Sequence, residues 1–213
     1  MYNGYRFTTP DPLSERYYST SPYAYCLNNP VIHVDRDGKK VYYASNVSNE
    51  FKNDFKQAVL YLNENGMGYL LAELQASDKI YYIEEGKPLT SSKFNTGTQT
   101  IIWSSRTGLL TNNAFELSPA TILNHEIDHA VQFDRNRQQQ LKDAALQDKD
   151  YGNKEERRVI TGSEQKTARA LGEIGKKEVT RSDHYGTLYE TTGPTKTEWK
   201  NPVIIKAKEK DKK

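Results

Sequence analysis

The chain has 213 residues, which is enough for one ordinary domain and an additional segment. Its formal net charge of +2 is close to balanced, so the composition gives no reason to expect a nucleic-acid partner. Cys26 is the single cysteine, which excludes both a disulfide within the chain and a zinc site built from cysteines. We expect no membrane span, because no apolar run approaches about 18 residues. We also expect no signal peptide, because the first residues lack an apolar stretch.

Residues 1–40 differ in composition from the rest of the chain. They contain four of the eight prolines and many tyrosines. Proline at this density interrupts both helices and central strands. Turn signals recur at Asp11-Pro12, Ser21-Pro22, Asn29-Pro30 and Asp37-Gly38. These patterns predict short extended pieces and turns, too small to form a core of their own.

Helices and strands are predicted for much of residues 40–104. Phe51, Phe55, Val59 and Leu62 recur at helical spacing, and Ser48 is a plausible N-cap before them. Runs rich in β-branched and aromatic residues predict strands. In chain order we expect a strand at 40–43, helices at 46–63 and 69–75, a strand at 79–83, a loop at 84–97 and a strand at 98–104.

The pattern His-Glu-x-x-His begins at His125. Ser118 is a suitable N-cap and Pro119 suits the first helical turn, so a helix is predicted to begin there. Apolar residues surround the motif on most sides, which indicates a buried helix. His125 and His129 would share one face of that helix and could bind one metal ion. Glu126 would point about 100° away, where it can act as a general base on a metal-bound water.

A catalytic zinc ion normally takes three protein ligands and a water. The longer metzincin pattern would require glycine at position 132 and histidine at position 135, where the chain has Gln132 and Arg135. That class is therefore excluded. The remaining histidines are His33, in the N-terminal segment, and His184. A carboxylate is the expected third ligand.

Candidate carboxylates lie on two short helices predicted downstream, at 153–162 and 163–171. Asn153 can cap the first, and Gly162 can end it or mark a bend. A Glu-Glu pair is more often a solvated helix face than a metal ligand, so spacing alone does not choose among them. The candidates are Glu155, Glu156 and Glu164.

The first 40 residues also contain three motifs in a fixed order. The residues concerned are Arg6, Phe7, Asp11, Pro12, Leu13, Tyr23, Ala24, Tyr25, Asn28, Asn29, Pro30, Asp35 and Gly38. They resemble the C-terminal end of the Rhs repeat-associated core, with its patterns R-[FY]-x-x-x-D-P-L, Y-A-Y-x-x-N-N-P and D-P-x-G. The resemblance implies that this segment is the end of a large β-cage whose C-terminal cargo is a toxin. Such cages often cleave themselves near the last motif, where Arg36 stands in place of the family's proline.

Motifs in the second half of the chain are HEIDHA at 125–130, EERRV at 155–159, SEQKTARALG at 163–172 and RSDHY at 181–185. In this order they resemble the NleD-like effector metalloproteases and, more remotely, the clostridial neurotoxin light chains. The resemblance implies a gluzincin-type site, in which Glu155 is the third zinc ligand and Glu156 the alternative. Glu164 would then support the site from behind the ligands.

The same resemblance implies roles for residues 181–185 and for the strand that precedes the motif helix. Arg181, with His184 or Tyr185, would stabilise the oxyanion that develops during peptide hydrolysis. In zincins a strand shortly before the motif helix lies at the sheet edge and can pair with an extended substrate. By this analogy we expect the strand at 98–104 to be an edge strand.

We therefore expect an α+β fold of zincin-like type, mainly helical with a small sheet. It would span residues 41–200, between the Rhs-core end at 1–40 and a Lys-rich tail at 201–213. The expected function is that of a Zn²⁺-dependent endopeptidase toxin, or effector, that hydrolyses a protein of the target cell. Expected partners are that substrate, a cognate immunity protein and the parent Rhs cage, with no nucleic acid. Such a protein would be made in the bacterial cytoplasm, exported by a secretion system without a cleavable signal, and act inside the target cell.

Two other hypotheses stay open. The chain could be an Rhs-associated toxin of another chemistry, such as a nuclease, in which the His-Glu-x-x-His helix is structural. It could also be only a structural end-piece of the cage. The near-neutral charge disfavours the nuclease, and the regular helical patterns after residue 46 disfavour the end-piece.

Overall fold

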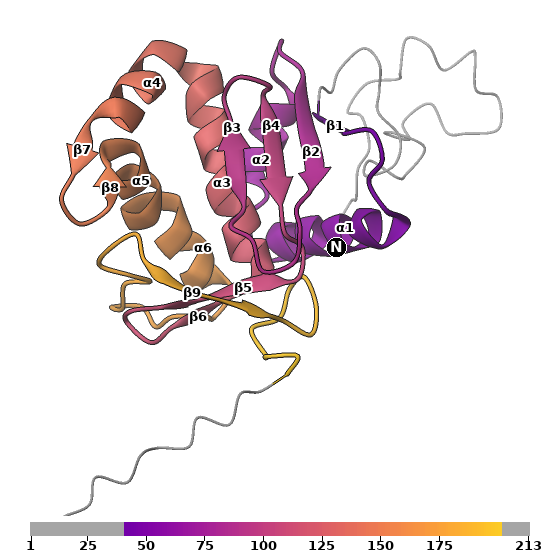
Figure 1. Cartoon of the computed structure of the whole chain (residues 1–213), viewed down its shortest axis with the longest axis vertical. Coiled ribbons are helices and arrows are strands. Elements are labelled where there is room, and N and C mark those ends of the chain that lie inside the picture. Colours follow the sequence, from indigo (N-terminus) through magenta and orange to yellow (C-terminus); the bar gives the residue numbers. More distant parts are fainter. Residues whose placement is uncertain (1–40, 202–213) are drawn as a thin grey trace, which may run out of the picture.

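A computed structural model of the chain describes residues 41–201. The Rhs-like segment and nearly all of the Lys-rich tail lie outside the described residues, and so do the expectations for them. The described part is a mixed α+β arrangement in which helices and three small sheets surround one central helix, α3 (Figure 1).

Helix α3, Pro119–Arg135, contains the His-Glu-x-x-His motif. The Ser118 side chain accepts a hydrogen bond from the N–H of Thr121 at 3.3 Å, and Pro119 occupies the first turn. Most of the helix is buried, including polar residues such as Asn124. Figure 1 shows it between the four-stranded sheet and helices α5 and α6. The predicted capped and buried helix is therefore confirmed.

The larger sheet has the strand order β1-β2-β4-β3. Its parallel strands are β1 (Val41–Tyr43), β2 (Tyr81–Glu85) and β4 (Thr100–Trp103), and β3 (Lys93–Asn95) pairs antiparallel with β4. In β2, Tyr81 and Ile83 are buried whereas Tyr82 is exposed. This alternation is typical of a sheet that packs one face on the core.

Two predictions for this sheet are wrong. Segment 84–97, predicted as a loop, contains the end of β2 and the whole of β3. The strand predicted at the sheet edge corresponds to β4, which lies inside the sheet because β3 covers one side of it. Strand β3 is only three residues long and has glycine, proline and serine around it, so its pattern is that of a loop. Only its pairing with β4 makes it a strand.

Helices α1 (Asn49–Glu64) and α2 (Tyr69–Gln75) share one core with this sheet and α3. Ser48 caps α1 as predicted, accepting from the N–H of Phe51 at 3.0 Å. The helix begins three residues later than expected, and α2 has the predicted bounds. Trp103 ties β4 to the start of α3, because its indole N–H donates to the carbonyl of Pro119 at 2.9 Å.

A second sheet, which the sequence did not predict, lies at the N-terminal end of α3 (Figure 1). Its strands are β6 (Glu116–Leu117), β5 (Thr107–Thr111) and β9 (Gly186–Glu190), all antiparallel. A Cβ atom at position 186 would lie 2.6 Å from Cδ1 of Leu109 and 2.8 Å from the carbonyl oxygen of Leu110. Glycine at this position therefore lets β9 approach β5 closely.

After α3 the chain forms a helical layer beside it. Its elements are α4 (Arg137–Ala145), β7 (Gln147–Asp148), β8 (Gly152–Asn153), α5 (Lys154–Val159), the π-helix η3 (Ile160–Glu164) and α6 (Gln165–Ala170). Asn153 caps α5 as predicted, accepting from the N–H of Glu156 at 2.9 Å. Gly162 lies within η3 and ends neither helix.

The π-turn decides which glutamates of this run face the same way. Glu156 and Glu164 are eight residues apart, which in an uninterrupted α-helix turns them about 80° away from each other. A π-turn widens the helix locally by about one residue. The two glutamates therefore lie as if about seven residues apart, nearly two full turns, and both contact His125.

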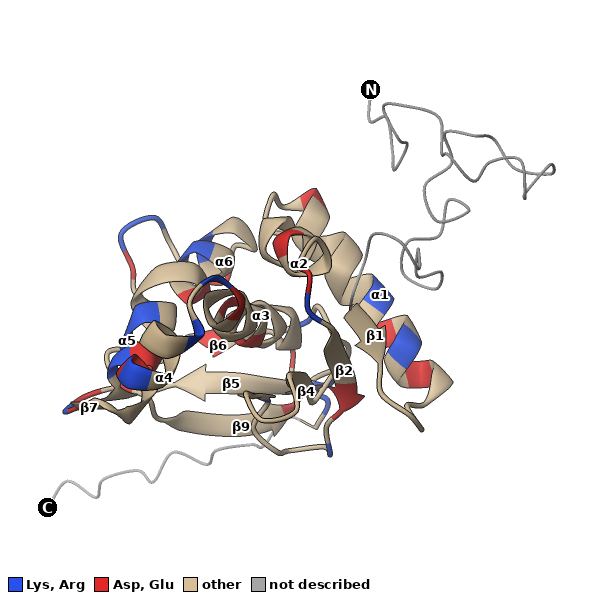
Figure 2. Ribbon diagram, turned by 90° about the horizontal axis from the view of Figure 1, so that it is seen from above, with Lys and Arg blue, Asp and Glu red and all other residues tan. Residues whose placement is uncertain are grey.

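Charged residues of both signs are mixed over the surface, as Figure 2 shows for α1 and α5. Among the described residues, none of the helices combines the length and apolar composition that crossing a membrane requires.

Candidate metal centre

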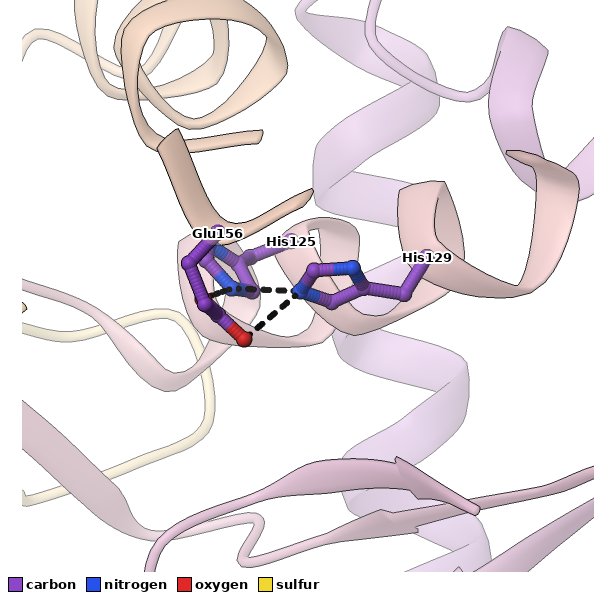
Figure 3. A group of neighbouring side chains, drawn as sticks. All are labelled: His125, His129 and Glu156. Carbon is purple, nitrogen blue, oxygen red and sulfur yellow. Dashed lines mark hydrogen bonds and ion pairs between the residues drawn. The ribbon is translucent and has the colours of Figure 1, made fainter. Parts of the chain in front are cut away.

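The imidazoles of His125 and His129 lie side by side in a nearly buried position, as their spacing on α3 requires. Their Nε2 atoms are 3.1 Å apart. Glu156 reaches the same point from α5: one carboxylate oxygen is 3.3 Å from Nε2 of His125, and the other is 3.3 Å from Nε2 of His129. Figure 3 shows its carboxylate facing the two rings. These three side chains form a group that could hold a metal ion.

The spacing of the three groups suits zinc. Ligand atoms about 2.0–2.1 Å from a tetrahedral zinc ion lie roughly 3.3 Å from one another. The two Nε2 atoms are 3.1 Å apart, each lies 3.3 Å from a different oxygen of Glu156, and one ligand atom from each residue lies within 4.8 Å of the others. Oε2 of Glu156 is buried, and Nε2 of His125 and Nε2 of His184 each lie 3.3 Å from it. A buried carboxylate oxygen of this kind is stabilised by a cation, and two imidazoles with a carboxylate are a common zinc-binding set.

Glu155 occupies a different place from the one that the resemblance favoured. Its Oε1 lies 3.0 Å from Nδ1 of His129, on the far side of the ring from Glu156. Consecutive helical residues point about 100° apart, so Glu155 and Glu156 cannot both face the same point. The geometry thus puts Glu156, the alternative, with the two Nε2 atoms.

Glu164 contacts His125 in the same way as Glu155 contacts His129. Its Oε2 lies 2.9 Å from Nδ1 of His125. A carboxylate at Nδ1 accepts that proton and leaves the Nε2 lone pair free for a metal. Glu155 and Glu164 thus orient both rings in the form that binds a cation.

An arginine in turn holds each of these two carboxylates. Arg158 donates from Nε and Nη2 to both oxygens of Glu155, at 2.9 and 2.7 Å, and from Nη1 to Asp128 at 3.0 Å. Arg158 therefore ties α5 to α3. Ser163 also donates to the Asp128 carboxylate. No sequence motif pointed to Arg158 or Asp128, although the spacing of Arg158 from Glu155 is that of neighbours on a helix.

Arg181 holds Glu164 in the same way. Its Nε and Nη2 donate to the two oxygens of Glu164, at 3.1 and 2.5 Å, and the Thr180 hydroxyl donates to the same carboxylate at 2.7 Å. Nη1 of Arg181 donates to the carbonyl of His184 at 3.2 Å. The buried guanidinium is thus engaged with Glu164 and with the segment that contains His184.

His184 and Tyr185, both candidates from the sequence, line the cavity over the metal group. Nε2 of His184 is 3.3 Å from Oε2 of Glu156, and its side chain is about half exposed. The Tyr185 side chain is largely exposed, with a relative accessibility of 72%.

Glu126 is buried and lines the same cavity, but it is not among the three grouped residues. Burial raises the pKa of its carboxyl, and the neighbouring histidines and a backbone hydrogen bond from Phe94 in β3 only partly oppose this. Strand β3 therefore contacts the residue that the sequence predicts as the general base.

The centre as a whole favours positive charge. Burial lowers the pKa of His125 and of His129, but contacts with the surrounding glutamates outweigh it and raise the values to about 9 and about 10. The same contacts hold the pKa of Glu156 well below its usual range, although burial opposes this. Four carboxylates around two imidazoles attract protons or, in their place, a metal dication.

A cavity of about 570 Å³ opens onto this group. Its size is within the usual range for ligand sites in proteins. Loop residues 90–92 and strand β3 line one side, and α4, α5 and β9 line others.

Comparisons of the chain with protein-family models, with curated proteins and with solved structures found no match.

Proposed function

We propose that the chain is a zinc-dependent endopeptidase with a gluzincin-type site. One observation supports this most directly. Glu156 reaches the Nε2 atoms of both histidines of the motif, while the motif's own Glu126 stays outside that group and lines the same cavity. A metal site with a separate, buried carboxylate beside it is what hydrolysis by an activated water requires.

His125, His129 and Glu156 would hold the ion. Bound there, Zn²⁺ would supply a Lewis acid for the peptide carbonyl and lower the pKa of water to about 7. Glu126 takes a proton from the attacking water as its oxygen bonds to the carbonyl carbon. It passes this proton to the amide nitrogen as the C–N bond breaks, which yields a carboxylic acid and an amine.

His184 is the residue best located to donate to the developing oxyanion. Its imidazole reaches the metal group and is partly open to the cavity. Arg181 acts through other groups, since it orients Glu164 and holds the backbone of His184. Tyr185 lines the same cavity with a largely exposed side chain and could approach a bound substrate.

A zincin-like fold is part of this proposal. The motif helix packs beside the sheet, and β3 is the edge strand nearest to it. Among the described strands only β4 pairs with β3, so an extended peptide could add to its other side.

We also propose that the enzyme is the toxin cargo of an Rhs protein. The motifs in residues 1–40 support this, together with the order of motifs from residue 125 onward. The proposed partners are a protein of the target cell, an immunity protein and the parent cage. Export by a secretion system and action inside the target cell belong to the same hypothesis.

The test compares wild type with Glu126→Gln, both for zinc content and in target cells. Both proteins should purify with one zinc ion per chain. New protein N-termini and toxicity should appear only with wild type. Glu84→Gln, an exposed glutamate outside the cavity, is the matched control and should behave as wild type. Purification without zinc, or full toxicity of Glu126→Gln, would favour a toxin of another chemistry.

A further inference from the structure

The cavity wall beside the metal group is apolar on one side. Ile122 lies three residues before His125 and seven before His129, so it shares their face of α3. At a rise of about 1.5 Å per residue it lies roughly 4.5 Å from His125 along the helix axis, toward the N-terminal end of α3. Ile122 lines the cavity and is only partly buried.

The second sheet completes this apolar wall. Leu109 of β5 and Leu188 of β9 are directly opposite each other in the antiparallel pair, and both line the cavity. Ile122 and Leu188 pack against the small core cluster that contains Leu109. Leu188, like Ile122, retains exposed area. The three side chains thus present apolar surface to the same cavity that contains the metal group.

The other walls of the cavity are mixed, because Phe94 of β3 and Ala144 of α4 line it together with polar residues. Ser91, Ser92 and Thr96 line it near β3. Gln140, on α4, also lines it; its side chain is 4% exposed and its amide oxygen has no hydrogen-bond partner among the described residues. Ile122, Leu109 and Leu188 form the apolar part of the lining at the N-terminal side of the metal group along α3.

We propose that Ile122, Leu109 and Leu188 form a specificity subsite for an apolar side chain of the substrate, adjacent to the scissile bond. This inference rests on the proposed peptidase function. When the scissile carbonyl of a peptide lies at the metal group, the side chains on either side of the cut bond lie close to that group. One of these side chains then packs against the apolar wall. Apolar pockets of this kind discriminate by about 10- to 100-fold in kcat/KM between side chains that fill them and those that do not.

The test uses zinc-loaded enzyme and a library of peptides prepared from a digested proteome. Cleavage sites of the wild type should share leucine, isoleucine, methionine or phenylalanine on one and the same side of the cut bond. Leu188→Asp should shift the preference at that position to lysine and arginine, and Leu188→Lys should shift it to aspartate and glutamate. A reversal of charge preference cannot result from general loss of structure.

Leu141→Asp and Leu141→Lys are the matched controls, because Leu141 is an exposed leucine on α4 that does not line the cavity. Both should keep the wild-type preference. If the Leu188 variants do not bind zinc or melt early, Ile122→Ala replaces them and should enlarge the subsite, favouring phenylalanine and tryptophan.

Two negative results are distinguishable. Wild-type enzyme that binds zinc but cuts no peptide would overturn the proposed function, and this subsite with it. Cleavage without an apolar preference, or with the same preference in the Leu188 variants as in wild type, would overturn the subsite alone.

Discussion

Glu155 and Glu156 are consecutive residues, yet they contact opposite nitrogens of the same imidazole. Glu155 lies 3.0 Å from Nδ1 of His129, and Glu156 lies 3.3 Å from its Nε2. The pair thus divides two tasks, since one carboxylate orients the ring and the other completes the group that could hold a metal ion.

Removing each carboxylate should affect zinc to a different degree. Glu156→Gln should abolish stoichiometric zinc binding, because it removes one of the three proposed ligands. Glu155→Gln should keep the zinc but weaken its affinity about 10- to 100-fold, the usual effect of losing a carboxylate behind a metal-bound histidine. Competition with a chelator measures both affinities. The assignment is wrong if Glu155→Gln loses the metal and Glu156→Gln keeps it.

Replacing Arg158 should destabilise the protein, because Glu155 and Asp128 would stay buried without their cation. Since the Arg158 side chain is 33% exposed, we expect a loss of about 2–3 kcal/mol for Arg158→Ala, below the range for fully buried pairs. Arg157→Ala is the control, since that side chain is 60% exposed and its partner Asp148 also accepts backbone hydrogen bonds from Asp150 and Tyr151. Its loss should be much smaller than that of Arg158→Ala, because exposed ion pairs contribute little to stability. Urea unfolding of the zinc-free proteins measures both, and equal losses would contradict the role given to Arg158.

Glu173 should make stability depend on pH. Burial raises the pKa of this carboxyl from 4.5 to about 7, although Ser118 and Thr121 donate hydrogen bonds to it at the start of α3. The folded state therefore holds this proton more tightly than the unfolded state. The stabilisation that comes from this more tightly held proton on Glu173 is complete below about pH 4.5 and is lost as pH rises through about 7.

Glu173→Gln keeps a hydrogen-bond acceptor and removes the charge. We compare the free energy of unfolding of this variant with that of wild type. The difference, variant minus wild type, should be larger at pH 8 than at pH 5 by at most about 3 kcal/mol. Thermal unfolding of both proteins at the two pH values measures the difference, and other titrating groups cancel in the comparison. A difference between the two proteins that is the same at pH 5 and pH 8 would show that Glu173 titrates normally.

Zinc uptake should release protons. In the zinc-free protein the surrounding glutamates raise the pKa values of His125 and His129 to about 9 and about 10, so the pair of rings binds protons at neutral pH more readily than free imidazoles do. Zinc must displace these protons, and its affinity should therefore rise from pH 6 to pH 8. Calorimetry in two buffers of different ionisation enthalpy counts the protons released. Equal affinity at both pH values, with no proton release, would contradict the raised pKa values.

Patterns among neighbouring residues were sufficient to predict the helices whose spacing and caps depend only on those neighbours. The apolar spacing in α1, the caps Ser48, Ser118 and Asn153, and the bounds of α2 were all read correctly from neighbouring residues. Strand β3 was missed, since nothing within its three residues distinguishes it from the loop around it. The second sheet was missed as well, because β5 and β9 are far apart in the chain and become neighbours only through folding.

For the site, the sequence by itself determined the pair His125 and His129 and the separate position of Glu126, because spacing along one helix places these side chains. Only the tertiary structure decided between Glu155, Glu156 and Glu164. That choice depends on how α5 is rotated against α3, on the π-turn that aligns Glu156 with Glu164, and on Arg158 and Arg181, which hold the other two carboxylates against the histidines. Spacing within a helix is independent of the rest of the fold, whereas the rotation of one helix against another is set by packing between residues far apart in the chain.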